Sequence, residues 1–384
     1  MKTTICALSA SLFGLAGMAY AQQRPAVAGH LTIGATDQTA ALAYWTPERM
    51  ANAKPMPLPT LDPATASLNA SPLAPLLPQQ FSAGAPPAGN LETTGLPAQT
   101  FEMLNHGDTA VPANVQPDFT YEFPFSNYQP PVQNAYPYAT VGKLFFVIPP
   151  GASEPAGDYV CSGSVTANKY TVLTARHCMY DVNTGIWYNS WVFDPAYNSG
   201  PNPTYGNSWT PRQLETWVTG STYDYDIGFM QMNDLSGTGC NGSDGTNPIG
   251  YYTGYLGYTY NGSYAQRQWS IFGFPQASPF AGNHLYQDDA ATGTLNPFGT
   301  TNIVEAGNPQ TGGTSGGPWV IGLIPKNSAD PAPSNNTIKG GNFANGVNSF
   351  QWTSPSQPLA INGPEFQTYN FLNLFTAYKG LSCP

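Results

Sequence analysis

Apolar residues gather in short runs along the second half of the chain, and turn-forming residues separate the runs. The first run spans 141–148, and the next two span 159–166 and 170–175. Short apolar runs bounded by Gly, Pro, Asn and Ser are typical of buried β-strands. Further strands are predicted at 190–193, 227–232, 269–274, 318–324 and 346–350. Because no helical segments alternate with these strands, the pattern predicts an all-β fold of the sandwich or barrel type.

A different period begins near the C-terminus. Phe366, Tyr369, Leu372 and Phe375 lie three residues apart, and Gly380 follows them as a stop signal. This spacing predicts one amphipathic helix over about 365–379, with the apolar side packed against the rest of the fold.

The first 137 residues lack such patterns. Residues 1–21 combine Lys2, an apolar run and the ending Ala19-Tyr20-Ala21, which is typical of a cleaved secretory signal peptide. Residues 51–100 contain ten prolines and ten alanines without a helical or alternating pattern. We therefore predict a pro-segment or linker, largely irregular, over 22–137, with a small independent domain within 22–138 as the alternative.

The remaining residues, 138–384, are predicted to form the functional domain. Their number allows two small barrels, at about 138–240 and 245–360, followed by the C-terminal helix. No segment after the leader is long and apolar enough for a membrane span. We therefore expect a soluble, exported protein with no membrane contact.

Charge and cysteine content narrow the function classes. Charged residues make up 9% of the chain and the net charge is −10, which argues against a nucleic-acid partner. Four cysteines remain after the leader is removed, namely Cys161, Cys178, Cys240 and Cys383. An even number in an oxidising compartment favours two disulfides, and four cysteines allow three pairings. A metal site is the alternative, although no Cys-x-x-Cys or paired His spacing supports it.

Two motifs carry the candidate chemistry. The segment 312–318 reads Gly-Gly-Thr-Ser-Gly-Gly-Pro, and 174–178 reads Thr-Ala-Arg-His-Cys. Glycines around Ser315 allow backbone N–H groups to converge on one point, where an oxyanion could be stabilised beside the hydroxyl. His177 supplies a base that could activate this hydroxyl. The alternative is a glycine-rich loop and a core histidine without catalytic function.

With Asp-Ile-Gly-Phe-Met at 226–230, these motifs resemble the chymotrypsin-like, or trypsin-like, serine peptidases, in the order His, Asp, Ser. The segments 136–146 and 193–198 are similar to secreted microbial members related to glutamyl endopeptidases. The resemblance implies a double antiparallel β-barrel and a triad of His177, Asp226 and Ser315 in the crevice between the barrels. Asp224 is the alternative to Asp226.

The resemblance also implies supporting roles. Backbone N–H groups of Gly313 and Ser315 would form the oxyanion hole. Gln310, Thr311 and Ser349 would lie at the substrate-binding site. The motif around His177 favours a disulfide between Cys161 and Cys178, which would pair Cys240 with Cys383.

The chain departs from the family pattern at several positions. Thr314 replaces the aspartate that receives a new N-terminus in trypsin-type enzymes, and no Lys or Arg occurs from 55 to 142. We therefore expect maturation at a non-basic bond, between Asn105 and Tyr138. Arg176 replaces a small residue and is expected to point to solvent. Asn348 stands near the position of a histidine in glutamate-specific relatives, and no aspartate near 309–311 could bind a basic side chain.

Together these features predict a secreted serine endopeptidase that acts on polypeptides through an acyl-enzyme. It is expected to be a monomer, made as a zymogen, with no metal or organic cofactor. One alternative is a catalytically inactive homologue that serves as a secreted binding module. An esterase with the same nucleophile is another, although the strand-turn-helix setting of α/β-hydrolases is missing.

Overall fold

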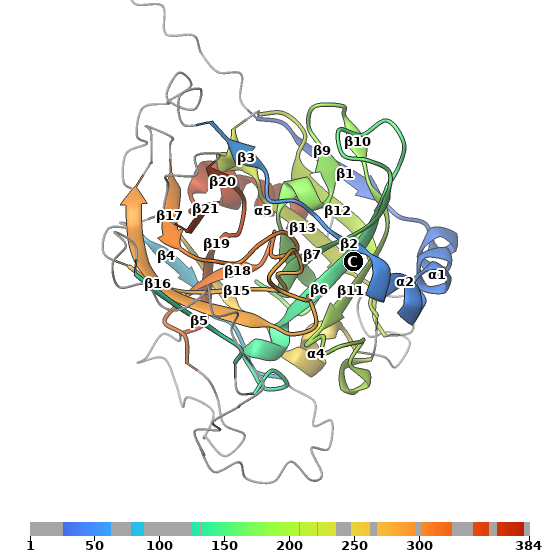
Figure 1. Ribbon diagram of the computed structural model, residues 1–384, viewed down its shortest axis with the longest axis horizontal. Helices are drawn as coiled ribbons and strands as arrows, with labels where there is room; N and C mark the ends of the chain where they lie inside the picture. The colour runs from blue at the N-terminus through green and yellow to red at the C-terminus, as the bar shows by residue number, and fades with distance from the viewer. Residues whose placement is uncertain are drawn as a thin grey trace, which may run out of the picture.

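Two β-sheets dominate the computed structural model of this protein (Figure 1). The structure describes residues 26–62, 78–87, 124–130, 132–206, 208–220, 222–235, 247–261, 267–295, 302–324, 341–352 and 359–379. Predictions for the leader at 1–21, Cys240 and Cys383 lie outside these residues. Among the described residues, no helix combines the length and the apolar character needed to cross a bilayer.

The first sheet, called here the first barrel, has eight strands, seven of them in the spatial order β1-β12-β13-β8-β7-β6-β11, with β2 paired to β7. All of its neighbouring strands are antiparallel except β2 and β7. Its strands are β1 (Ala28–Thr32), β2 (Lys54–Pro55), β6 (Val141–Ile148), β7 (Gly157–Val165), β8 (Thr171–Thr174), β11 (Asn189–Pro195), β12 (Pro211–Trp217) and β13 (Gly228–Met232).

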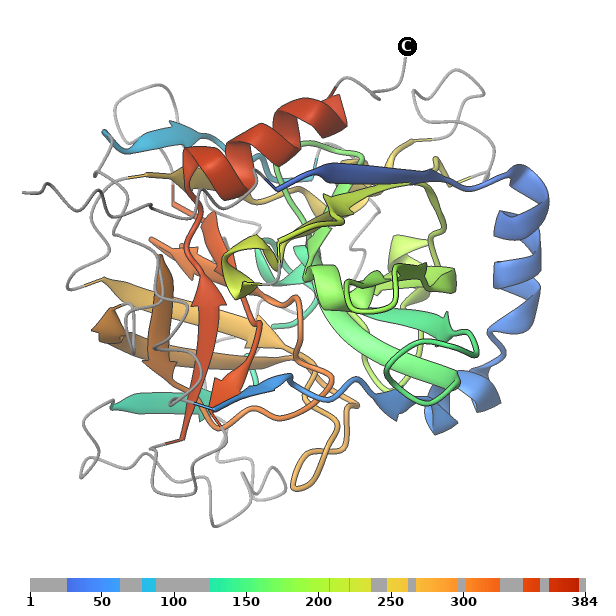
Figure 2. The same ribbon diagram turned by 90° about the horizontal axis from the view of Figure 1, so that it is seen from above.

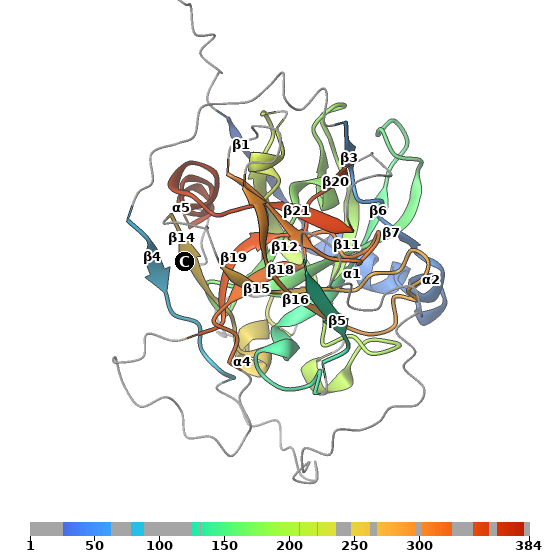
Figure 3. The same cartoon turned by 60° about the vertical axis from the view of Figure 1, so that its left-hand side comes forward.

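The second sheet, called here the second barrel, has nine strands, eight in the order β21-β17-β16-β15-β18-β19-β14-β4, with β5 paired to β16. Only β14 and β19 pair in parallel. Its strands are β4 (Gln80–Ser82), β5 (Phe125–Tyr128), β14 (Gly257–Tyr260), β15 (Gln268–Gly273), β16 (Tyr286–Leu295), β17 (Ile303–Gly307), β18 (Pro318–Ile321), β19 (Phe343–Val347) and β21 (Ala360–Pro364). Figure 3 shows β4 beside β14 and β5 against β16.

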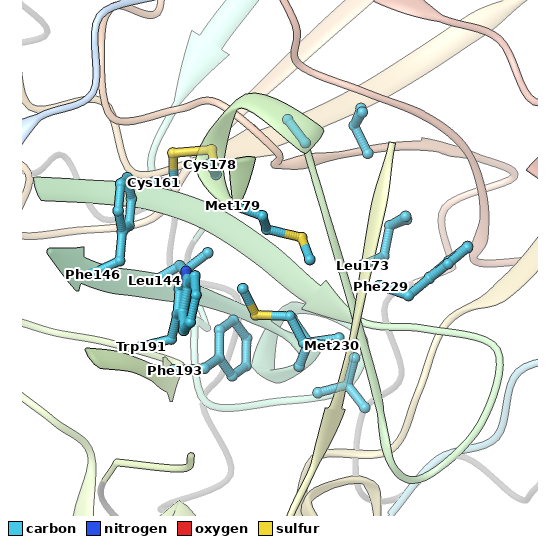
Figure 4. Packing of buried hydrophobic residues seen from close by; sticks show 14 of the residues in the cluster. Leu144, Phe146, Cys161, Leu173, Cys178, Met179, Trp191, Phe193, Phe229 and Met230 are labelled. Atoms are coloured by element: carbon cyan, nitrogen blue, oxygen red, sulfur yellow. A yellow bond between two sulfur atoms is a disulfide. The ribbon is translucent and has the colours of Figure 1, made fainter. Parts of the chain in front are cut away.

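Buried aromatic and aliphatic side chains explain why the predicted runs become strands. Strand β6 has eight residues and lies between β7 and β11. Its residues Leu144, Phe145 and Phe146 therefore have no solvent exposure. Figure 4 shows Leu144 and Phe146 among buried side chains that include Phe193, Met230 and the Cys161–Cys178 disulfide. The prediction of an all-β double barrel with a C-terminal helix is confirmed.

The C-terminal helix begins with a π-helical turn over Thr368–Leu372 and continues as α5 over Asn373–Lys379. It lies across both barrels in Figure 2. The N–H groups of Phe371 and Leu372 both donate to the Gln367 carbonyl, at 3.0 and 3.2 Å. This widened turn rotates the buried face, so that Phe371 is fully buried while Leu372 is only half-buried.

The described parts of 22–137 lie against both barrels. Helices α1 (Ala35–Tyr44) and α2 (Pro47–Asn52) lie at the outer end of the first barrel, and the chain then runs toward the second barrel (Figure 2). There β3 (Thr60–Leu61) pairs in parallel with β20 (Gln351–Trp352). The assignment of 22–137 as a pro-segment stays a prediction.

Short helices and a hairpin complete the described fold. They are the 3₁₀ turns η2 (Tyr138–Thr140), η3 (Arg176–Cys178), η4 (Pro203–Tyr205) and η5 (Tyr223–Tyr225), the helix α4 (Ile249–Thr253), and the hairpin of β9 (Tyr180–Asp181) with β10 (Ile186–Trp187). Two of them, η3 and η5, position the candidate site.

Candidate active site

Asp226 holds His177 by two hydrogen bonds. His177 lies in η3, directly after β8, and Asp226 follows η5 at the start of β13. Asp226 Oδ1 accepts the backbone N–H of His177 at 2.9 Å, and Oδ2 lies 2.8 Å from His177 Nδ1. Because Nδ1 then carries the proton, the other ring nitrogen, Nε2, is left as the acceptor. This is the tautomer that a general base needs.

Asp226 keeps its negative charge although it has no solvent exposure. Burial alone would raise its pKa, but the His177 ring, the hydrogen bonds from it and the positive charge of Arg176 together hold the pKa below the ordinary value. A further hydrogen bond comes from Ser349 Oγ, which donates to Asp226 Oδ2 at 2.5 Å. The placement of Ser349 at the substrate-binding site stays a prediction; its hydroxyl group is bonded to Asp226.

The side chain of Arg176 is buried, which the sequence did not predict. The expectation that it points to solvent is wrong, because it is 3% exposed. Its guanidinium group donates to the carbonyl oxygens of Gly220 at 2.7 Å and Thr222 at 3.4 Å. These two carbonyls precede η5, so Arg176 fixes the turn that delivers Asp226 to the neighbouring histidine.

Asp224, the alternative to Asp226, occupies a different environment. It is 7% exposed, and its backbone carbonyl accepts a hydrogen bond from Asn370 Nδ2 at 2.9 Å. Burial raises the pKa of Asp224 to about 8, although a Thr222 hydrogen bond lowers it in part. A carboxyl group that is protonated at neutral pH offers no charge to an imidazolium. The charge of Asp226 and its hydrogen bond to the His177 ring therefore favour Asp226 over Asp224.

The loop around Ser315 depends on two glycines in the left-handed region. Gly313 has φ +96°, and a Cβ there would lie 2.8 Å from the Phe274 carbonyl oxygen. Gly316 has φ +80°, and a Cβ there would lie 2.2 Å from Thr174 Oγ1. Only glycine adopts these angles without strain and lets the loop approach the first barrel this closely.

Contacts between the barrels bring Ser315 toward His177. The backbone N–H of Ser162 in β7 donates to the Ser315 carbonyl at 2.7 Å, and Ser162 Oγ donates to the Gly313 carbonyl at 2.9 Å. Cys178 Sγ lies 3.7 Å from the Ser315 carbonyl oxygen. Two residues that are 138 positions apart in the numbering, 177 and 315, are thus brought into one region.

The two atoms that the predicted chemistry would join are both unpartnered. His177 Nε2 and Ser315 Oγ are buried and have no hydrogen-bond partner among the described residues. Both atoms therefore keep the hydrogen-bonding capacity that the predicted proton transfer requires. In free enzymes, catalytic hydrogen bonds are often long and tighten when substrate binds.

Cys161 and Cys178, which are 17 positions apart, form the predicted disulfide directly beside His177. The two sulfur atoms and a ring nitrogen of His177 lie within 4.8 Å of one another. Since both sulfurs are joined to each other, neither is the thiolate that a metal would require. Here the disulfide ties η3 to β7.

The residues predicted around the specificity pocket form a hydrogen-bond network. Thr314 Oγ1 donates to Gln310 Oε1 at 2.5 Å and accepts from Asn348 Nδ2 at 2.9 Å. Asn348 also receives the Trp319 indole N–H at 2.8 Å. Thr311 Oγ1 donates to the Ala277 carbonyl at 2.6 Å. Neutral side chains therefore order the loop that carries Ser315.

One contact at the site comes from a segment that the sequence did not connect with it. The backbone N–H of Gly313 donates to the carbonyl oxygen of Met56 at 2.9 Å. Met56 lies between Pro55 and Pro57, and Pro59 is the second residue after Pro57. Alternating prolines favour extended backbone, which is the only local signal for this arrangement.

A glutamyl endopeptidase of Bacillus licheniformis is 30% identical to this chain over 131 residues. The match covers 34% of the chain and 33% of the relative, so the chain spans about a third of the length of that relative. The resemblance to chymotrypsin-like serine peptidases related to glutamyl endopeptidases is confirmed. No protein-family model matches the chain.

Two solved structures of proteases are similar to part of this chain. A thermostable serine protease, AL20, from an extremophilic microorganism has a TM-score of 0.49 and 28% identity, covering 63% of this chain and 97% of that protein. Protease Anisep from Arthrobacter nicotinovorans has a TM-score of 0.49 and 28% identity, covering 66% and 98%.

Proposed function

We propose that this chain is a secreted serine endopeptidase that hydrolyses polypeptides through an acyl-enzyme intermediate. The observation that carries the proposal is the double hydrogen bond from His177 to buried, ionised Asp226, which leaves Nε2 free beside the Ser315 loop. A histidine needed only for packing would not require an ionised carboxylate with no solvent exposure, because burying that charge costs free energy.

The proposed reaction follows the general serine-peptidase scheme. Ser315 Oγ attacks the carbonyl carbon of the substrate while His177 Nε2 accepts the hydroxyl proton. The negative charge that develops on the carbonyl oxygen is stabilised by the N–H groups of Gly313 and Ser315. The imidazolium, stabilised by Asp226, then protonates the leaving amine, and a water molecule activated by the same His177 hydrolyses the ester.

Each proton transfer in this scheme is assigned to a side chain of the chain itself, so the proposed reaction calls for no metal or organic cofactor. Residues 309–311 carry no charge that would bind a Lys or Arg side chain, and this argues against cleavage after basic residues. Export is supported by the leader-like pattern of residues 1–21 and by the disulfide, which is typical of oxidising compartments.

Peptide cleavage by matched serine variants tests the proposal. The chain, Ser315→Ala and Ser126→Ala are incubated with a peptide library, and cleavage products are identified by mass spectrometry. Ser126 lies exposed on β5 and serves as the control. We expect Ser315→Ala to lose on the order of 10⁶-fold in turnover and Ser126→Ala to match the parent. Cleavage that is detectable and equally fast in the parent and Ser315→Ala would show that Ser315 is not the nucleophile.

A further inference from the structure

The segment 53–61 crosses from the first barrel to the second barrel next to the candidate site. In Figures 1 and 2, the blue chain that follows α2 first pairs with β7 of the first barrel through β2 and then reaches β20 at the second barrel, where β3 pairs with it. Its sequence is Ala-Lys-Pro-Met-Pro-Leu-Pro-Thr-Leu. We call this stretch the crossing segment.

Backbone hydrogen bonds attach the crossing segment to both walls of the site. The Met56 N–H donates to the Val160 carbonyl at 2.9 Å, directly before Cys161 of the disulfide. At the other end, the Gln351 N–H donates to the Pro59 carbonyl at 2.9 Å, two residues after Ser349. An added strand of this kind is a common way in which a protein binds an extended peptide.

Between these two ends, a carbonyl group of the crossing segment accepts the hydrogen bond from the N–H group of Gly313, which is one of the predicted oxyanion-hole donors. The Met56 carbonyl oxygen accepts the Gly313 N–H at 2.9 Å. A Cβ on Gly312 would lie 2.9 Å from that oxygen and 3.5 Å from both Pro55 Cβ and Pro57 Cα. The backbone of the segment is therefore packed against the nucleophile loop, and Ser315 has no solvent exposure.

Apolar side chains hold the crossing segment in place. Met56 is 4% exposed and belongs to the large core cluster, while Leu58 is 7% exposed and belongs to the cluster of Trp269 and Trp319 in the second barrel. The Ala53 carbonyl accepts Gln276 Nε2 at 2.5 Å. Burying the Met56 and Leu58 side chains stabilises the segment in this position. The contact of Met56 with Gly313 is therefore held by the fold and is not accidental.

We propose that the crossing segment is an intramolecular ligand that blocks the active site of the full chain. This inference rests on the proposed function, and it assigns a regulator to the same site. The bond that follows the bound carbonyl is Met56–Pro57, whose nitrogen carries a proline ring carbon in place of a hydrogen. The ring hinders proton delivery to this nitrogen, so the segment binds without becoming a good substrate.

The first test measures occupancy without catalysis. In the full chain carrying Ser315→Ala, hydrogen exchange of the Gly313 amide is compared with and without Leu58→Asp, which places a charge in the apolar cluster. We expect exchange to accelerate at least about tenfold in Leu58→Asp. Leu42→Asp, at a position on α1 that is 43% exposed, is the control and should leave exchange unchanged.

The second test measures access to the nucleophile. A fluorophosphonate reagent is added to the full chain with Ser315 intact, and the rate of adduct formation is followed by mass spectrometry. We expect Leu58→Asp to raise the rate at least about tenfold and the milder Leu58→Ala to raise it by a smaller factor. A synthetic peptide of residues 53–61 should slow labelling of the Leu58→Ala chain again and remain uncleaved.

The outcomes separate this inference from the proposed function. Equal amide exchange and equal labelling in the parent, Leu58→Ala and Leu58→Asp would overturn the inference and leave the proposed function standing. Faster exchange in Leu58→Asp without labelling in any form would retain the intramolecular ligand and contradict the proposed nucleophile.

Discussion

His177 depends on a small set of side chains that fix its ring from behind. Asp226 accepts from both the ring and the backbone of His177, while Ser349 donates to the same carboxylate. Arg176 anchors the turn that precedes Asp226. Because these groups are buried, they lose little entropy when a substrate binds, and this preorganisation is what catalysis by a general base requires.

Matched substitutions of the two acidic residues test this arrangement. Asp226→Asn keeps the shape but removes the charge and favours the wrong histidine tautomer, so turnover should fall by about 10⁴. Asp224→Asn changes a group that is already protonated at neutral pH, and turnover should stay within about threefold of the parent. Steady-state kinetics on a cleaved library peptide, with Leu58→Asp present in the parent and in each variant to open the site, provide the measurement. A larger loss in Asp224→Asn would reverse the assignment.

Sequence motifs predicted some of these residues better than others. Ser315 and the disulfide partner Cys178 stand in motifs whose chemistry is readable from local order. The buried position of Arg176 was not predictable, because its carbonyl partners lie 44 and 46 residues away in the chain. Ser349 was found by its short pattern, but only the folded chain directs its hydroxyl group to Asp226.

At the scale of elements, strands with a uniformly apolar sequence could be predicted, whereas strands of mixed polar and apolar sequence could not. The run 141–148 coincides with β6, whose two neighbours bury both of its faces. Strand β16 has the sequence Tyr-Gln-Asp-Asp-Ala-Ala-Thr-Gly-Thr-Leu, which offers no apolar alternation. Pairing with β15, β17 and β5 makes it a strand. Such tertiary pairing leaves no local signal.

The C-terminal helix gives a sharp test at this scale. The three-residue spacing predicted Leu372 on the packed face, whereas the π-helical turn buries Phe371, which stacks on Phe366 with ring centroids 4.2 Å apart. Phe371→Ala should destabilise the fold by about 3–5 kcal/mol, and Leu372→Ala by less than about 2 kcal/mol. Urea unfolding of both variants measures this difference. An equal or greater loss at Leu372 would contradict the widened turn.

At the scale of the whole molecule, the crossing segment joins the barrels on one side and the C-terminal helix joins them on another (Figure 2). Residues 54–61 gave no periodic pattern, and their partners Val160 and Gln351 lie far along the chain. The sequence therefore indicated an irregular N-terminal segment but not where it binds. The candidate site requires both barrels, since β8 leads to His177 and the loop before β18 carries Ser315.

Covalent mapping of the nucleophile tests the central claim most directly. The full chain and its Leu58→Asp form are each incubated to completion with a fluorophosphonate, alongside His177→Ala versions, and the modified residue is located by peptide mass spectrometry. We predict one adduct, on Ser315, that forms on the order of 10³-fold or more slowly when His177 is absent. Absence of an adduct in both forms, or labelling of Ser315 at the same rate without His177, would contradict a serine nucleophile activated by His177.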